Sequence, residues 1–144
     1  MSALTVYQGL EERFRTVSGL QNIILGEPTA AHALPALYTA LERFERPMAS
    51  QPPADNVTAM RYFFTHRLVI QWQDNAAAEM QLLTLLNAIP AAVDADPKLG
   101  NRITSGNARI SDGIAAYIKI GDTLYRIVDY TGEVLEKANR SSGL

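Results

Sequence analysis

Hydrophobic residues recur every three or four positions near the start of the chain, which is the spacing of one face of a helix. The apolar positions are Val6, Tyr7, Leu10, Phe14 and Val17. Thr5 followed by Gln8 has the spacing of a capping box at the start of this helix. Ser18-Gly19 marks its end, because glycine readily adopts the left-handed conformation that follows a helix.

Two later segments have the composition of strands. Gln21 to Leu25 is a short apolar run, and Arg61 to Trp72 is rich in the aromatic and β-branched residues that favour a pleated surface. One face of the longer strand would carry Phe64, His66, Leu68, Ile70 and Trp72, and the other Phe63, Thr65, Arg67, Val69 and Gln71. This segment is the clearest strand in the chain.

The segment from Ala36 to Arg46 fits two structures. Its leucines recur at helical spacing, and Ala, Leu, Glu and Arg all favour a helix. However, Pro35 biases the residue before it toward extended geometry, and Tyr38, Ala40, Glu42 and Phe44 also fit a one-sided strand. The pattern alone supports helix and strand equally. The following segment, Pro47 to Val57, has the composition of a loop.

A second helix is expected after Asp74 or Asn75, either of which is a good N-cap. Glu79 would lie in its first turn, where the helix dipole favours an acidic side chain. Its apolar stripe comprises Met80, Leu82, Leu83, Leu85, Leu86 and Ile89. Pro90 is expected to end or kink this helix, with a short turn continuing through Val93. The stripe is wider than a lone surface helix needs, which indicates an interface.

The last third of the chain predicts strands. Ala108 to Ser111 and Ile114 to Ile120 are two short extended segments, and Gly121-Asp122 is a hairpin turn leading into Thr123 to Tyr130. The segment from Lys137 to Leu144 is polar and is expected to be flexible.

The order helix, strands, helix and hairpin predicts an α+β fold. We expect an antiparallel or mixed sheet of about four to six strands with helices packed on one face. At 144 residues the chain has the length of one domain, so we expect a single α+β domain over residues 1–136 and a flexible C-terminal tail over residues 137–144.

Charge and composition exclude several functional classes. The formal net charge is −2 and the 13 Lys and Arg residues are scattered, which disfavours the basic face that tight nucleic-acid binding requires. The absence of cysteine excludes disulfides, thiol catalysis and cysteine-based zinc sites. The N-terminus lacks a signal-peptide pattern and no run approaches about 18 consecutive apolar residues. We therefore expect a protein made in the cytoplasm without a membrane segment.

The candidates for acid–base or metal chemistry are few. His66 lies mid-strand between two apolar residues, where a satisfied, half-buried histidine is the favoured interpretation. His32 lies in a loop and has no metal-ligand partner at helical spacing. Asp94 and Asp96 resemble a fragment of a calcium loop, but the further ligands and the glycine are missing, so solvation of a helix end is favoured.

Other candidates also have simpler interpretations. Ser105-Gly106-Asn107 and Ser111-Asp112-Gly113 have turn compositions, and Ser111 has no base beside it. Trp72 and Tyr125 could stack a base or a sugar, but Trp72 on an alternating strand is favoured as a core residue. Glycine-rich phosphate-binding motifs are absent. The sequence therefore predicts no catalytic, cofactor-binding or metal-binding residues, and a protein that is not an enzyme.

From Thr5 to Val134 the order of segments resembles the tail terminator (tail completion) proteins of long-tailed bacteriophages. The N-terminal amphipathic helix is one matching feature. The others are Leu34-Pro35-Ala36-Leu37-Tyr38 opening a strand, the aromatic strand Arg61 to Trp72 with Gln73-Asp74 leading into a leucine-rich helix, Asn87-Ala88-Ile89-Pro90 at the end of that helix, and Tyr125-Arg126-Ile127-Val128 in the closing hairpin.

The resemblance implies a viral structural protein. Its segment 36–46 would be a strand, and its subunits would form a homohexameric ring that caps the tail tube, stops tube polymerisation and offers the surface onto which the head docks. The implied partners are other copies of the chain, the tail tube protein and the head-completion or connector protein. DNA would pass through the lumen without specific binding. The implied location is the neck of the virion, assembled in the bacterial cytoplasm, and no catalytic, cofactor or metal residues carry over.

Two alternatives remain open at this point. The first is another phage neck component, such as a head-closure or head–tail adaptor protein, distinguished by the partner that it binds. The second is a small-ligand-binding α+β domain with a pocket between helix and sheet near His66, Tyr38 and Tyr125.

Overall fold

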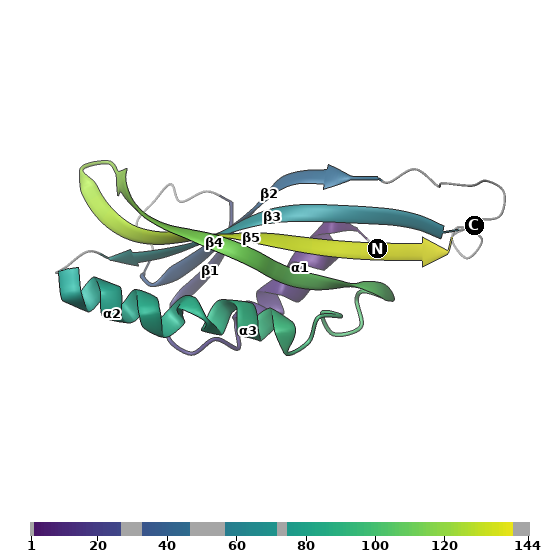
Figure 1. The fold of residues 1–144 in the computed structure, drawn as a ribbon, viewed down its shortest axis with the longest axis horizontal. Helices are drawn as coiled ribbons and strands as arrows, with labels where there is room; N and C mark the ends of the chain where they lie inside the picture. Colours follow the sequence, from purple (N-terminus) through teal and green to yellow (C-terminus); the bar gives the residue numbers. More distant parts are fainter. Residues whose placement is uncertain (1, 27–32, 47–56, 72–74, 140–144) are drawn as a thin grey trace.

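The computed structural model describes residues 2–26, 33–46, 57–71 and 75–139. The elements in chain order are α1 (Ala3–Phe14), β1 (Asn22–Leu25), β2 (Ala36–Glu45), β3 (Val57–Gln71), α2 (Asn75–Leu86), α3 (Ala88–Asp94), β4 (Ser105–Ile120) and β5 (Thr123–Asn139). The strands form one five-stranded sheet in the order β1-β2-β3-β5-β4. Among the described strands only β1 and β2 pair in parallel, and the helices pack on one face of the sheet (Figure 1). The predicted α+β fold with a mixed sheet is confirmed.

Helix α1 begins earlier than its predicted capping box. Ser2 is the N-cap, and its hydroxyl accepts a hydrogen bond from the main-chain nitrogen of Thr5 at 3.1 Å. The prediction that Thr5 and Gln8 form the cap is therefore wrong, because serine two residues before Leu4 already satisfies a free N–H of the first turn. The predicted apolar stripe of the helix is buried against the sheet and α3.

The segment from Ala36 to Arg46, whose pattern fits a helix and a strand equally, forms strand β2 over Ala36–Glu45. Ala36, Leu37, Tyr38 and Thr39 are all buried, whereas the part of the strand beyond Ala40 is largely exposed. The first half is thus covered on both faces and the second half on neither, so the strand does not show the one-sided alternation that identifies an amphipathic strand. Strand β3 does show it, with Phe64, His66, Leu68 and Ile70 buried on the helix side as predicted.

The second helical region is broken between Leu86 and Ala88. Pro90 lies in the first turn of α3, where its missing N–H costs no bond within α3 but prevents α2 from continuing. The predicted break and the short following turn are confirmed. Glu79 lies beyond the first turn of α2, so its predicted role at the positive end of the helix dipole is wrong.

Strand β4 is one long strand where two short ones were predicted. Ser105-Gly106-Asn107 and Ser111-Asp112-Gly113 lie within it, so the interpretation of both as turns is wrong. A register shift between Ile110 and Asp112 places Ser111 at a β-bulge, which absorbs the irregularity without ending the strand.

The closing hairpin turns where it was predicted to turn. Gly121 has a φ of 63°, which glycine adopts without strain at the first central position of a two-residue turn. Strand β5 extends to Asn139, so the first residues of the predicted tail continue the sheet. Residues 140–144 lie outside the described residues, as do residues 47–56 of the predicted loop.

The two faces of the sheet differ. The main core lies between the sheet and the three helices and includes Phe14, Leu68, Ile70, Leu82 and Ile89. On the opposite face, the described residues form one small buried cluster of Ala36, Tyr38, Val69 and Ile127. We call this second face the open face, because no described helix packs on it.

Candidate assembly surface

His66 is a structural residue of the core. Its side chain is only 1% exposed, its Nδ1 lies 2.8 Å from the hydroxyl of Thr39, and the ring of Phe14 packs edge-on at 5.0 Å. Burial lowers its pKa to about 3, because the charged form loses its hydration in the core. His66 is therefore neutral at physiological pH and inaccessible to a substrate. It is satisfied, as predicted, but fully rather than half buried.

The other predicted chemical candidates do not come together. Asp94 is exposed at the end of α3, and an Asp96 carboxylate oxygen accepts a hydrogen bond from the main chain of Gly100 at 2.8 Å. The hydroxyl of Ser111 donates to the main-chain oxygen of Thr131 at 3.3 Å. Across the described ranges, no three histidine, aspartate or glutamate side chains converge as metal ligands. His32 and Trp72 lie outside those ranges.

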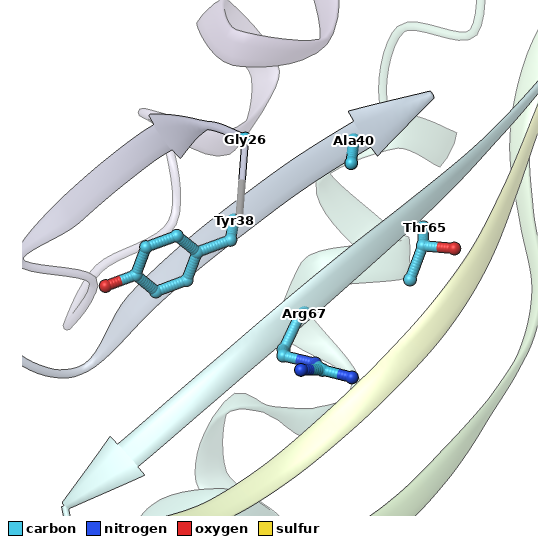
Figure 2. A pocket seen from close by; sticks show the side chains of 5 residues that line it. All are labelled: Gly26, Tyr38, Ala40, Thr65 and Arg67. Atoms are coloured by element: carbon cyan, nitrogen blue, oxygen red, sulfur yellow. The ribbon is translucent and has the colours of Figure 1, made fainter. Parts of the chain in front are cut away.

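The alternative ligand pocket near His66, Tyr38 and Tyr125 is not formed. His66 faces the helices, whereas Tyr38 and Tyr125 belong to the cluster on the open face. A hollow on the open face is lined by Gly26, Tyr38, Ala40, Thr65 and Arg67 and has a volume of about 30 Å³ (Figure 2). This space suits a water molecule rather than a metabolite.

Charged side chains cross the open face in a connected row. Glu45 on β2 pairs with Arg43 and Arg61, at 2.9 and 3.5 Å. Glu133 on β5 pairs with Arg61 of β3 at 3.0 Å and with Arg109 of β4 at 2.9 Å. The row thus joins four strands with alternating charge. Such a surface neutralises itself, which suits contact with solvent better than tight binding of a polyanion.

Two further ion pairs fix the strands and α2. Arg67 and Asp129 form a two-pronged pair across β3 and β5, at 2.7 and 3.0 Å. Arg126 on β5 pairs with Glu79 of α2, lies over the ring of Tyr117 and donates to the main-chain oxygen of Ala116 at 2.9 Å. Arg126 therefore ties α2 and β5 to β4.

Helix α2 is apolar on both sides. Its inner side buries Ala78, Leu82 and Leu85, while Met80 and Leu83 on the outer side are 69% and 62% exposed. The predicted surplus of apolar surface on this helix is confirmed. By length and composition alone, the stretch Asn75–Asp94, which spans α2 and α3, is apolar enough to cross a membrane. Of the apolar window in this stretch, 33% is buried. Core helices of globular proteins have the same composition, and the inner side of this one packs on the sheet.

The edges of the sheet carry most of the other exposed apolar side chains. Of the eight large hydrophobic residues that are exposed within the described ranges, five lie on edge strands. They are Leu25 on β1, Leu41 and Phe44 on β2 beyond the end of β1, and Ile114 and Tyr117 on β4. These exposed edges were not predicted from the sequence. Their one local signal is the uncharged stretch from Gly113 to Ile118.

Comparison of the sequence with protein-family models and with curated proteins finds no match.

Proposed function

We propose that this chain is a tail terminator protein of a long-tailed bacteriophage. Its copies form a homohexameric ring that caps the tail tube, stops tube polymerisation and provides the head-docking surface. The resemblance in segment order from Thr5 to Val134 motivates the proposal. The resemblance required a strand in the ambiguous segment, and β2 occupies Ala36–Glu45.

The observation that carries the proposal is exposed apolar surface at several separate places. The outer side of α2, the β4 edge and the β1/β2 edge each expose large hydrophobic side chains. Surfaces of this kind mark contacts with other proteins. Two different surfaces on one subunit allow head-to-tail contacts, which close into a ring when the rotation between copies closes.

The proposed mechanism is physical rather than chemical. A head-to-tail ring has two different faces, so one face can match the end of the tail tube while the other cannot accept a further tube ring. Growth stops at that point, and the free face binds the head-completion or connector protein. DNA passes through the lumen, and the self-neutralising charge row on the open face is compatible with passage without tight binding.

The experiment that tests this function combines native mass with tube binding. We expect purified protein to form rings of about six copies, alone or on tube ends, and to shorten tubes when it is present during polymerisation of the tube protein. Binding to a connector protein but not to tubes would instead indicate another neck component. A protein that remains monomeric and binds neither would refute the proposal.

A further inference from the structure

The edge of β4 that faces away from β5 is hydrogen-bonded near its start and open further along. Near its start, the main-chain nitrogen of Ala108 donates to the main-chain oxygen of Pro97 at 2.8 Å, and the Lys98 ammonium group donates to the main-chain oxygen of Gly106. Beyond the bulge at Ser111, β5 is the only described strand that pairs with β4. The outer edge from Gly113 to Ala116 therefore lacks a strand partner in the described part of the chain.

This open stretch lacks the features that protect edge strands in monomers. Soluble proteins place charges, proline or bulges on exposed edges, because unpaired main-chain groups otherwise recruit another strand. The six residues Gly-Ile-Ala-Ala-Tyr-Ile from Gly113 to Ile118 include no charge and no proline. Ile114 is 74% exposed, the largest exposed fraction among the large hydrophobic side chains described. The edge has the composition of a strand that is covered in its working state.

The opposite edge of the sheet likewise has no further strand beside it among the described residues. It consists of β1 (Asn22–Leu25), which has no charged residue, followed by the end of β2 beyond Thr39. Leu25, Leu41 and Phe44 are exposed along it. Each copy therefore presents two different edges, one at each side of the sheet.

The registers of the sheet place these two edges at the same level. When the paired residues are traced from β1 through β2, β3 and β5 to β4, Leu25 lies level with Gly113 and Asn22 lies level with Ala116. A copy displaced sideways would thus bring the uncharged β1 beside the uncharged part of β4. The two strands would be antiparallel, because β2, β3, β5 and β4 alternate in direction and β1 runs parallel to β2.

Charged residues also lie near the uncharged stretches on both edges. Arg109 on β4 is level with Arg43 on β2. Glu42 precedes Arg43, and Glu45 and Arg46 follow Phe44, so the charges at this end of the edge balance. Arg109 and Arg43 carry like charges, and each already pairs within its own copy, with Glu133 and Glu45 respectively. The uncharged stretches, and not the charges, would therefore select the pairing.

We propose that the β4 edge of one copy pairs antiparallel with the β1/β2 edge of the next copy, so that the sheet continues from subunit to subunit around the assembly. The inference rests on the proposed ring and names its subunit interface. The partner is a second copy of this chain, selected by matched levels and matched uncharged stretches. Met80 and Leu83 on α2 then remain available for the tube or connector protein.

A proline at Ala115 is the most direct test. Main-chain groups on an edge strand point alternately toward the neighbouring strand and away from it. The main-chain N–H of Ala108 points away from β5, because it donates to Pro97. Ala108 pairs with Val134 of β5, and Ala115 pairs with Val128. Val134 and Val128 are separated by an even number of residues, so the main-chain groups of Ala108 and Ala115 point in the same direction. Ala115 therefore also points outward, so Ala115→Pro removes a donor for an added strand and leaves the β4–β5 ladder intact.

We expect Ala115→Pro to raise the concentration needed for assembly by at least about tenfold while the monomer keeps its melting temperature. Leu25→Asp, on the other edge, should do the same. An equimolar mixture of the two variants has one intact pair of edges and should therefore form dimers but not rings. The matched control Leu4→Asp, on α1, replaces a side chain that is 58% exposed, against 57% for Leu25, and should assemble like the wild type.

The outcomes separate this inference from the proposed function. Wild-type rings that persist unchanged in Ala115→Pro and Leu25→Asp, or that are lost in Leu4→Asp, would overturn the edge interface while leaving the ring in place. A wild type that stays monomeric in solution and on tube ends would overturn both. If Ala115→Pro lowers the melting temperature of the monomer, Leu25→Asp and the mixture decide the result.

Discussion

The hydroxyl group of Tyr130 donates a hydrogen bond to the main-chain oxygen of Leu86 at 2.8 Å. Leu86 is the last residue of α2, and in a continuous helix its oxygen would accept a bond from the N–H of residue 90. Residue 90 is proline, which has no N–H. Tyr130 on β5 therefore supplies the donor that Pro90 removes, and fixes the break between α2 and α3 to the sheet.

Replacing Tyr130 with phenylalanine tests this role. The variant keeps the buried ring but leaves the Leu86 oxygen without its donor, so we expect a loss of about 1–3 kcal/mol in unfolding free energy. Urea unfolding at pH 7.5 measures it. The matched control is Tyr125→Phe, on the open face, which should stay within about 0.5 kcal/mol of the wild type. Equal values for the two variants would contradict the account.

Protonation of His66 should make the protein sensitive to mild acid. The folded-state pKa is about 3 and the ordinary value is 6.5, so between these values only the unfolded state readily binds the proton. Stability attributable to His66 is complete above about pH 6.5 and falls by roughly 1.4 kcal/mol for each pH unit below it. At pH 5 the loss should be roughly 2 kcal/mol, measured by urea unfolding across the pH range.

Two variants isolate the contribution of His66. His66→Phe should flatten the profile between pH 7 and pH 5, whereas His32→Gln should retain the wild-type slope. Glu136 changes stability in the opposite direction. Burial raises the pKa of its carboxyl group, so its protonation stabilises the folded state as the pH falls. An unchanged slope in His66→Phe would show that another group controls the acid sensitivity.

Gly132 is required by its contact with His66. A Cβ atom at position 132 would lie 2.4 Å from Nε2 of His66, well inside contact distance. We expect Gly132→Ala to destabilise the protein by about 1–3 kcal/mol, the usual cost of overpacking a core. Adding His66→Ala should recover part of this loss, because it removes the ring that the new methyl group meets. A strictly additive double variant would argue against the contact.

The charge row on the open face should contribute modestly to stability. Glu133→Gln removes the carboxylate that pairs with both Arg61 and Arg109, and its side chain is only 17% exposed. We expect a loss of about 1 kcal/mol, decreasing at high salt. Glu11→Gln, which breaks the exposed pair with Arg15 on α1, should have a smaller effect. A larger loss of stability in Glu11→Gln than in Glu133→Gln would contradict this description of the face.

The fold was predictable where one face of an element meets the core. Strand β3 alternates because helices cover one face and the charge row lies on the other, and the stripe of α1 is buried as its spacing predicted. Strand β2 was ambiguous because its first half is buried on both faces. Strand β4 was divided in two because Ser111-Asp112-Gly113 has the composition of a turn, whereas its register against β5 accommodates a bulge.

The candidate assembly surface was only half predictable. The excess apolar residues of α2 lie within one helix, so its spacing revealed them. The edges depend on strand order, which is set by pairings between residues far apart in the sequence. Leu25 and Ile114 become edge residues only because β1 and β4 are the two outermost strands of the sheet.

The native mass of the wild-type protein, measured across a concentration series with and without tail tubes and paired with electron micrographs, tests the central claim most directly. The account predicts closed rings of about six copies with a central hole, free or bound at tube ends. A protein that stays monomeric at every concentration and fails to bind tube ends would contradict it.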